Sequence, residues 1–175
     1  MVESVSETEG PIATDGGGRS CGGCAACCEG WLHDKSMNLF VGSACPNIVS
    51  EGCGIYEDRP EIPCRSFRCA WLDAPDLFEE DLRPDKSGAI VVTNRDWYDW
   101  KVVRAFPTSA SVPEQTLQRL AAFAKPQQLP VIFYEHHFEE GRFAGTSEKA
   151  LGPPAFAAEV RQRPSESDIF RSLVQ

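Results

Sequence analysis

The chain has 175 residues, enough for one domain of ordinary size with a small appended module. Its hydrophobic content of 42% and charged content of 25% are typical of a soluble globular protein. No apolar run approaches the roughly 20 residues that a membrane-spanning helix needs. The net charge of −9 argues against a nucleic-acid backbone as the main partner, because such binding relies on clustered positive charge.

The chain begins with an acidic, small and polar segment, residues 1–19. This segment lacks the basic start and the apolar stretch of a secretory signal. Its composition is typical of a disordered tail. We therefore expect a cytoplasmic protein whose ordered part begins near residue 20.

The next segment, residues 20–73, contains every cysteine of the chain. The eight cysteines are Cys21, Cys24, Cys27, Cys28, Cys45, Cys53, Cys64 and Cys69. Structural disulfides rarely persist in a reducing compartment. In addition, the Cα atoms of neighbouring Cys27 and Cys28 are about 3.8 Å apart, closer than the roughly 4.4–6.8 Å of a disulfide. The segment also shows little helix or strand periodicity, so we expect metal ligands to organise it.

The spacing Cys21-x2-Cys24-x2-Cys27 turns several sulfurs toward one centre. The same spacing supplies three thiolates to bacterial-type [4Fe–4S] clusters, whose fourth ligand is remote and followed by proline. Cys45-Pro46 fits that fourth position, and Cys28 is expected to turn elsewhere. The other candidates for the fourth ligand are Cys53, Cys64 and Cys69. Zinc sites use similar pairs of cysteines, so the pattern predicts zinc or an iron–sulfur cluster, in one or two sites, without choosing between them.

Three motifs occur in order: CGGCAACC over residues 21–28, CGIYEDRP over 53–60 and CRSFRC over 64–69. Together they resemble the YkgJ-type family, described as a zinc- or iron-chelating domain with a CxxCxxCC signature. The resemblance covers residues 20–72, under a third of the chain. It implies metal chelation by the cysteines and says little about the biological role.

Residues between the later cysteines are expected to surround the metal. A centre of Zn(Cys)4 or oxidised [4Fe–4S](Cys)4 carries a net charge of about −2, which nearby cations stabilise. Arg59, Arg65 and Arg68 could supply this charge; the alternative is that they form surface salt bridges worth about 0–1 kcal/mol each. Tyr56 and Phe67 are expected to shield the site from water.

Two histidine positions are weaker ligand candidates. His33 and Asp34 follow the CxxCxxCC run, but eight thiols already suffice, so a solvent-facing pair is favoured. His136 and His137 are neighbours on a predicted strand and should point to opposite faces. We expect them to be surface residues that do not share a metal.

Residues 74–175 predict an α+β unit that forms one compact domain with the cysteine-rich region. Runs of β-branched residues predict strands, over residues 89–94, 101–106, 130–136 and 141–145. Trp97, Tyr98 and Trp100, between the first two strands, are expected to pack a small core. The short connections favour a small antiparallel sheet packed with helices.

Three helices are predicted in this unit. Ser111 and Glu114 fit a capping box that opens the first, and Pro126 closes it. Its apolar stripe consists of Leu117, Leu120, Ala121 and Ala124. A second helix begins at Pro153 and Pro154, with Phe156 and Val160 on one face. A third is capped by Ser165 and carries Ile169, Phe170, Leu173 and Val174.

The sequence thus predicts a cytoplasmic metal-binding protein that chelates zinc or an iron–sulfur cluster through its cysteines. One alternative is an iron–sulfur redox or electron-transfer protein, or a cluster-dependent enzyme. Another is a metal carrier. No acid, base or nucleophile stands out, so catalytic residues, reaction and protein partner are not predicted, and neither a membrane nor a nucleic acid is expected as a partner.

Overall fold

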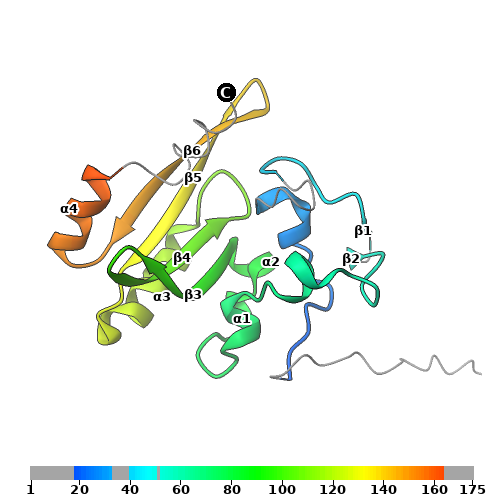
Figure 1. The fold of residues 1–175 in the computed structure, drawn as a ribbon, viewed down its shortest axis with the longest axis horizontal. Coiled ribbons are helices and arrows are strands. Elements are labelled where there is room, and N and C mark those ends of the chain that lie inside the picture. Colours follow the sequence, from blue (N-terminus) through cyan, green and yellow to red (C-terminus); the bar gives the residue numbers. More distant parts are fainter. Residues whose placement is uncertain (1–17, 33–39, 51, 164–175) are drawn as a thin grey trace, which may run out of the picture.

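The cysteine-rich part of the protein consists of short elements joined by turns. The computed structural model describes residues 18–32, 40–50 and 52–163 (Figure 1). The first elements are the helical turn η1 (Cys27–Trp31), the strands β1 (Ile48–Val49) and β2 (Gly52–Cys53), the helical turn η2 (Glu61–Arg65) and the helix α1 (Ala70–Asp73). β1 and β2 pair as a two-stranded antiparallel sheet. A hairpin of this size is marginally stable at best by itself, so this region depends on other interactions.

The second part of the described chain contains longer elements, and the predicted α+β class is confirmed. These elements are η3 (Glu80–Leu82), α2 (Pro84–Ser87), β3 (Ala89–Trp97), β4 (Trp100–Pro107), α3 (Glu114–Ala124), η4 (Lys125–Gln127), β5 (Val131–Glu139), β6 (Arg142–Leu151) and α4 (Pro154–Gln162). Each predicted strand overlaps an observed one. The predicted short fourth strand is instead the ten-residue β6.

The four long strands form one sheet in the order β3-β4-β5-β6. β3 pairs with β4, and β5 with β6, in the expected antiparallel sense. β4 and β5 run parallel, with Val103 opposite Val131, and this pair differs from the expected antiparallel arrangement. The reason is the connection: α3 lies between the two strands, and a helical crossover returns the chain to the sheet in its original direction.

Helix α3 begins at Glu114, directly after Pro113. The predicted capping role of Ser111 is wrong, because Ser111 pairs with Glu135 in an isolated β-bridge. Within the described residues, no side-chain hydrogen bond caps this helix. The predicted apolar stripe faces the core, and Leu120 in this stripe is fully buried.

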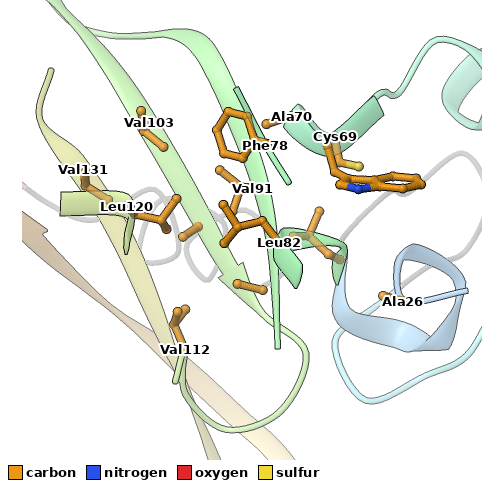
Figure 2. Close-up of a cluster of buried hydrophobic side chains, with 14 of the residues drawn as sticks. Ala26, Cys69, Ala70, Phe78, Leu82, Val91, Val103, Val112, Leu120 and Val131 are labelled. Atoms are coloured by element: carbon orange, nitrogen blue, oxygen red, sulfur yellow. The ribbon is translucent and has the colours of Figure 1, made fainter. Parts of the chain in front are cut away.

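One hydrophobic core joins the cysteine-rich part to the sheet. Cys69 and Trp71 enter it from the beginning of α1, and Val91 enters from β3. Figure 2 shows Val103, Leu120 and Val131 on one side of this core and Cys69 on the other, with Phe78 between them. Because the two parts share buried side chains, we expect them to unfold together.

A second, smaller core lies beneath α4. The rings of Trp97 and Trp100 each pack edge-on against Phe156, with centroids 5.2 Å apart. Phe156 is fully buried, whereas Tyr98 at the hairpin turn is 54% exposed. The predicted aromatic packing is therefore confirmed: the two tryptophans pack on Phe156, and the half-exposed Tyr98 packs edge-on against Trp97 with ring centroids 4.8 Å apart.

Some predictions fall outside the described residues. These are most of the tail (residues 1–17), the pair His33 and Asp34, and the last helix beginning at Ser165. Among the described helices, none is both long and apolar enough to cross a membrane.

Candidate metal centre

The eight cysteines come from segments that lie at the end of the molecule opposite α4, drawn from blue to teal in Figure 1. Cys45 and Cys69 are buried and the others are partly exposed. None of the eight is in a disulfide. The fold thus brings together eight thiols that are spread over residues 21–69.

Four of these thiols face the hydrophobic core; we call them the core-facing thiols, Cys21, Cys24, Cys27 and Cys69. Cys69 directly precedes α1 and is 5% exposed. Cys21 and Cys24 are held in a tight turn in which the Cys24 backbone N–H donates to the Cys21 carbonyl at 2.9 Å. Ala26, 1% exposed, inserts into the same core, and Figure 2 places it on the same side as Cys69.

The electrostatics of the core-facing thiols reflect this crowding. Burial, followed by the negative charges of Cys69, Cys21, Cys24 and Cys28, raises the pKa of the Cys27 thiol well above its ordinary value. Burial also raises the pKa of Cys69 to about 11, while the backbone N–H groups of Leu72 and Trp71 act in the opposite direction. Without a bound metal, the raised pKa values keep the Cys27 and Cys69 thiols protonated at neutral pH.

The remaining thiols lie farther from the core; we call them the outer thiols, Cys28, Cys45, Cys53 and Cys64. The Cys45 backbone N–H donates to the Cys28 carbonyl at 2.7 Å, and the chain then turns so that the Ile48 N–H donates to the Cys45 carbonyl at 3.1 Å. The β1–β2 hairpin pairs Cys53 with Ile48, three residues after Cys45. This pairing brings the Cys53 thiol close to Cys28 and Cys45.

Cys64, on η2, completes the outer group. Burial, followed by the charges of Cys45, Cys53 and Cys64, raises the pKa of the Cys28 thiol to about 12. A smaller contribution comes from Cys21, so the two groups are neighbours. In this arrangement Cys69, and not Cys45, accompanies the Cys21-x2-Cys24-x2-Cys27 run, whereas the sequence left Cys45, Cys53, Cys64 and Cys69 open for that place.

A glycine that the sequence reasoning missed makes this arrangement possible. Gly30 has φ +93°, and a Cβ atom at this position would lie 2.7 Å from the backbone carbonyl carbon of Ser43. The Gly30 carbonyl accepts a hydrogen bond from the Gly42 N–H at 2.8 Å. Only glycine permits this crossing of two backbone segments, and the crossing sets Cys45 against Cys28.

The residues expected to surround the metal gather around one small cavity of about 10 Å³. Cys21 and Cys64, one thiol from each group, both line this cavity. The other lining residues are Arg19, Ser20, Tyr56, Arg59, Arg65, Phe67, Arg68 and Leu72. Four arginines therefore lie around the boundary between the two groups of thiols.

Each predicted arginine is fixed by specific contacts. The Arg59 guanidinium lies 3.8 Å from the centre of the Tyr56 ring. Arg65 donates from Nε to the Arg59 carbonyl at 2.9 Å and from its terminal nitrogen to the Glu57 carbonyl. Arg68 forms an ion pair with Asp73 at 2.5 Å. Since Arg68 also lines the cavity, the two alternatives for it, metal-site neighbour and salt bridge, are compatible.

Two further charged residues near the thiols were not predicted. Arg19, at the edge of the expected tail, donates to the Trp71 carbonyl at 2.9 Å and lies over the Trp71 ring. Asp85, at the start of α2, accepts two hydrogen bonds from Arg83 at 2.7 Å. Burial raises the pKa of Cys24 and the charge of Asp85 adds to this, while the backbone N–H groups of Ala26 and Asp85 oppose it. Arg19 lies two residues before Cys21 in the sequence, whereas only the fold brings Asp85 near Cys24.

The prediction that both strand histidines are surface residues is wrong for His136. This side chain is 6% exposed, with Nδ1 3.0 Å from the Thr146 hydroxyl oxygen. It lies between Trp31, which stacks on it, and Phe143. Burial, with a smaller effect from His137, lowers the pKa of His136 to about 4. Its neighbour His137 is exposed, as expected.

The thiols are close but are not preassembled around a point. Among the described residues, no three His, Cys, Asp or Glu side chains already converge as a metal site. Comparison of the chain with family models, with curated proteins and with solved structures found no match. The resemblance to the YkgJ-type family stays a prediction based on the three cysteine motifs.

Proposed function

We propose that this protein binds metal through its clustered cysteines, as zinc or as an iron–sulfur cluster. The observation that carries the proposal is the gathering of eight unbridged thiols from several short segments at one end of the fold. Nitrogen and carboxylate ligands are not needed, because an all-sulfur donor set suits zinc and iron–sulfur centres.

The cysteine-rich region has little hydrophobic core of its own, and this supports the proposal. Among the described residues between 18 and 68, few are buried; these are Ala26, Gly30, Cys45 and Gly52. Two of them are glycines, so the region buries little apolar side-chain surface. Structural zinc supplies apparent binding energies of about 10–16 kcal/mol, enough to order a segment that lacks a core of its own. Metal binding accounts for how such a segment holds one conformation.

The surroundings of the thiols suit a negatively charged centre. A bound metal would deprotonate the thiols and hold four thiolates around itself. The guanidinium groups of Arg59, Arg65 and Arg68 lie around the cavity between the two groups and would offset that charge. The backbone N–H groups near Cys24 and Cys69 favour the thiolate forms.

The test is purification of the full chain without oxygen, followed by metal and acid-labile sulfide analysis. An iron–sulfur protein would be brown, would contain sulfide and would bleach on reduction with dithionite. A zinc protein would be colourless, with stoichiometric zinc and no sulfide. A reduced chain that contains neither metal and takes up neither on reconstitution would overturn the proposal.

A matched pair of variants locates the metal. Replacing Cys21 and Cys24 together by serine is expected to lower the bound metal and to loosen the turn that carries these two cysteines, because ligand binding holds it. His137→Gln, at an exposed residue far along the chain, is the control and should leave the metal content unchanged. Native chemical-shift dispersion and unchanged metal in the double cysteine variant would count against the proposal.

A further inference from the structure

The eight thiols divide into two groups by their packing, and the division uses every cysteine once. The core-facing thiols all belong to or pack against the core that contains Trp71, Phe78 and Leu120. None of the outer thiols contacts that core among the described residues. The outer thiols are joined to one another by the backbone bond from Cys45 to Cys28 and by the β1–β2 hairpin.

The division runs between two neighbouring residues. Cys27 packs against the core, whereas Cys28 lies with Cys45 and the hairpin. Both occur in the helical turn η1, where consecutive side chains point in different directions around the turn. Adjacent cysteines on such a turn cannot easily serve one tetrahedral centre, but each can serve its own.

We propose that the protein has two four-thiol metal sites, a core site of Cys21, Cys24, Cys27 and Cys69 and an outer site of Cys28, Cys45, Cys53 and Cys64. This inference rests on the proposed function and adds the ligand assignment and an order of metal release. Four thiolates complete a tetrahedral zinc site or the ligand set of one cubane cluster. The two sites adjoin across the arginine-lined cavity, which Cys21 and Cys64 both line.

The outer site is the one that exchanges metal first. Two of its ligands lie on short exposed elements: Cys53 on the two-residue strand β2 and Cys64 on η2. The side chains of Val49 and Ile62 on β1 and η2 are 53% and 70% exposed, and Cys45, although 6% exposed, lies outside the shared core. The core site is closed by Cys69, which is 5% exposed beside the buried Trp71. Opening the core site disturbs the shared hydrophobic core, whereas opening the outer site disturbs the hairpin, the helical turns and the loops outside that core.

Cobalt(II) titration of the reduced, metal-free full chain tests the assignment, because cobalt bound to four thiolates has strong absorption bands. The wild type should bind two equivalents. Cys53→Ser, Cys64→Ser and the double variant should each bind one equivalent in the tetrathiolate form, since all three lose only the outer site. Cys24→Ser should also retain one, and the cross-group double variant Cys24→Ser/Cys53→Ser should retain none.

The results separate failure of the assignment from failure of metal binding. One equivalent in the wild type, or a same-group double variant that loses both equivalents, would overturn the two-site assignment while leaving metal binding in place. A wild type that binds no cobalt, and that takes up neither zinc nor an iron–sulfur cluster on reconstitution, would overturn the proposed function as well. Because the outer-site variants keep the core intact, unfolding does not confuse their result; circular dichroism of the sheet checks this directly.

The kinetics of zinc release provide a second test of the two-site assignment. With zinc bound and a chelator in excess, the wild type should release zinc in two phases of equal amplitude. The fast phase should be absent from Cys53→Ser and present in Cys24→Ser. A fast phase that disappears instead with Cys24→Ser would reverse the predicted order of release and contradict the assignment of the outer site as the exchangeable one.

Discussion

At the scale of single residues, Cys69 connects the candidate metal centre to the fold. Its side chain is buried in the core that contains Phe78 and Val91, and the charge of its thiolate form raises the pKa of Cys27. In a protein without metal, such a thiol behaves as a small apolar side chain. With metal bound, the same atom would become a charged ligand anchored in the core, so binding and folding would be coupled at this position.

His136 provides a pH-dependent prediction at this scale. Its pKa is about 4 in the folded protein and near 6.5 in an unfolded chain, because burial disfavours the charged ring. The unfolded state therefore binds more protons between these values. Stability should be fully present above pH 6.5 and should fall by about 1–3 kcal/mol as the pH decreases toward 4.

Urea unfolding of the metal-free, reduced protein between pH 5 and 7 measures this effect without acid release of metal. His136→Gln should have a shallower pH dependence than the wild type. The control His137→Gln changes the exposed neighbour and should keep most of the wild-type slope. Equal slopes in the wild type and His136→Gln would contradict the predicted role of the buried ring.

Gly30 gives a second prediction. Gly30→Ala places a methyl group against the Ser43 backbone in a left-handed conformation, so we expect a loss of about 2–4 kcal/mol in the free energy of unfolding. It should also weaken metal binding by the outer thiols, because Cys45 no longer lies against Cys28. Gly23→Ala is the control, since a Cβ there meets nothing within 4 Å. Chemical denaturation and cobalt titration of both variants measure the two effects, and equal behaviour would argue against the crossing.

At the scale of elements, helix α3 determines how the sheet is connected. The helix crosses between β4 and β5 and makes that pair parallel. Thr116 on α3 is buried and donates from its hydroxyl to the Ser87 carbonyl at 2.6 Å, which ties the helix to the end of α2. The sheet is thus attached to the segment that follows the last cysteine.

Leu120→Ala tests this packing. Leu120 is fully buried in the shared core, and its truncation should cost about 2–5 kcal/mol. Gln118→Ala, on the exposed face of the same helix, should change stability by less than about 0.5 kcal/mol. Thermal unfolding followed by circular dichroism distinguishes the two, and a similar small effect of both would contradict the packing of α3 on the core.

The elements also show what local sequence can and cannot predict. The strands at 89–94 and 101–106 are rich in β-branched residues. They were predicted correctly because β-branched side chains favour the extended conformation of a strand. β6 has no clear alternation and extends to Leu151 because it pairs with β5 over most of its length. Ser111 fits a capping box by spacing, but its backbone pairs with Glu135. Pairing partners are tertiary information that spacing does not contain.

In the candidate site, too, local sequence predicts the composition of the site but not its tertiary contacts. That the cysteines cluster could be predicted from their spacing within residues 20–73. Which thiols become neighbours depends on the crossing at Gly30 and on the entry of Cys69 into the core. The burial of His136 likewise depends on Trp31, which is distant in sequence, and on Phe143, which the β5–β6 pairing brings beside it.

At the scale of the whole molecule, the cysteine-rich region and the sheet form one body through their shared core. Removing metal should therefore destabilise the sheet as well as the loops that carry the cysteines. We expect a single thermal transition whose midpoint falls by more than about 5 °C after chelation. Calorimetry before and after chelation, with metal loss verified, measures this. An unchanged midpoint would mean that the two parts fold independently.

The central claim is that all eight cysteines hold metal, and residue-resolved alkylation tests it most directly. The native protein, prepared without oxygen, is treated with iodoacetamide before and after chelation, and modified cysteines are identified by mass spectrometry. The account predicts that all eight, including the partly exposed Cys53 and Cys64, are protected while metal is present and that the partly exposed ones react once it is removed. Rapid alkylation of these cysteines that is the same with and without the chelator would contradict it.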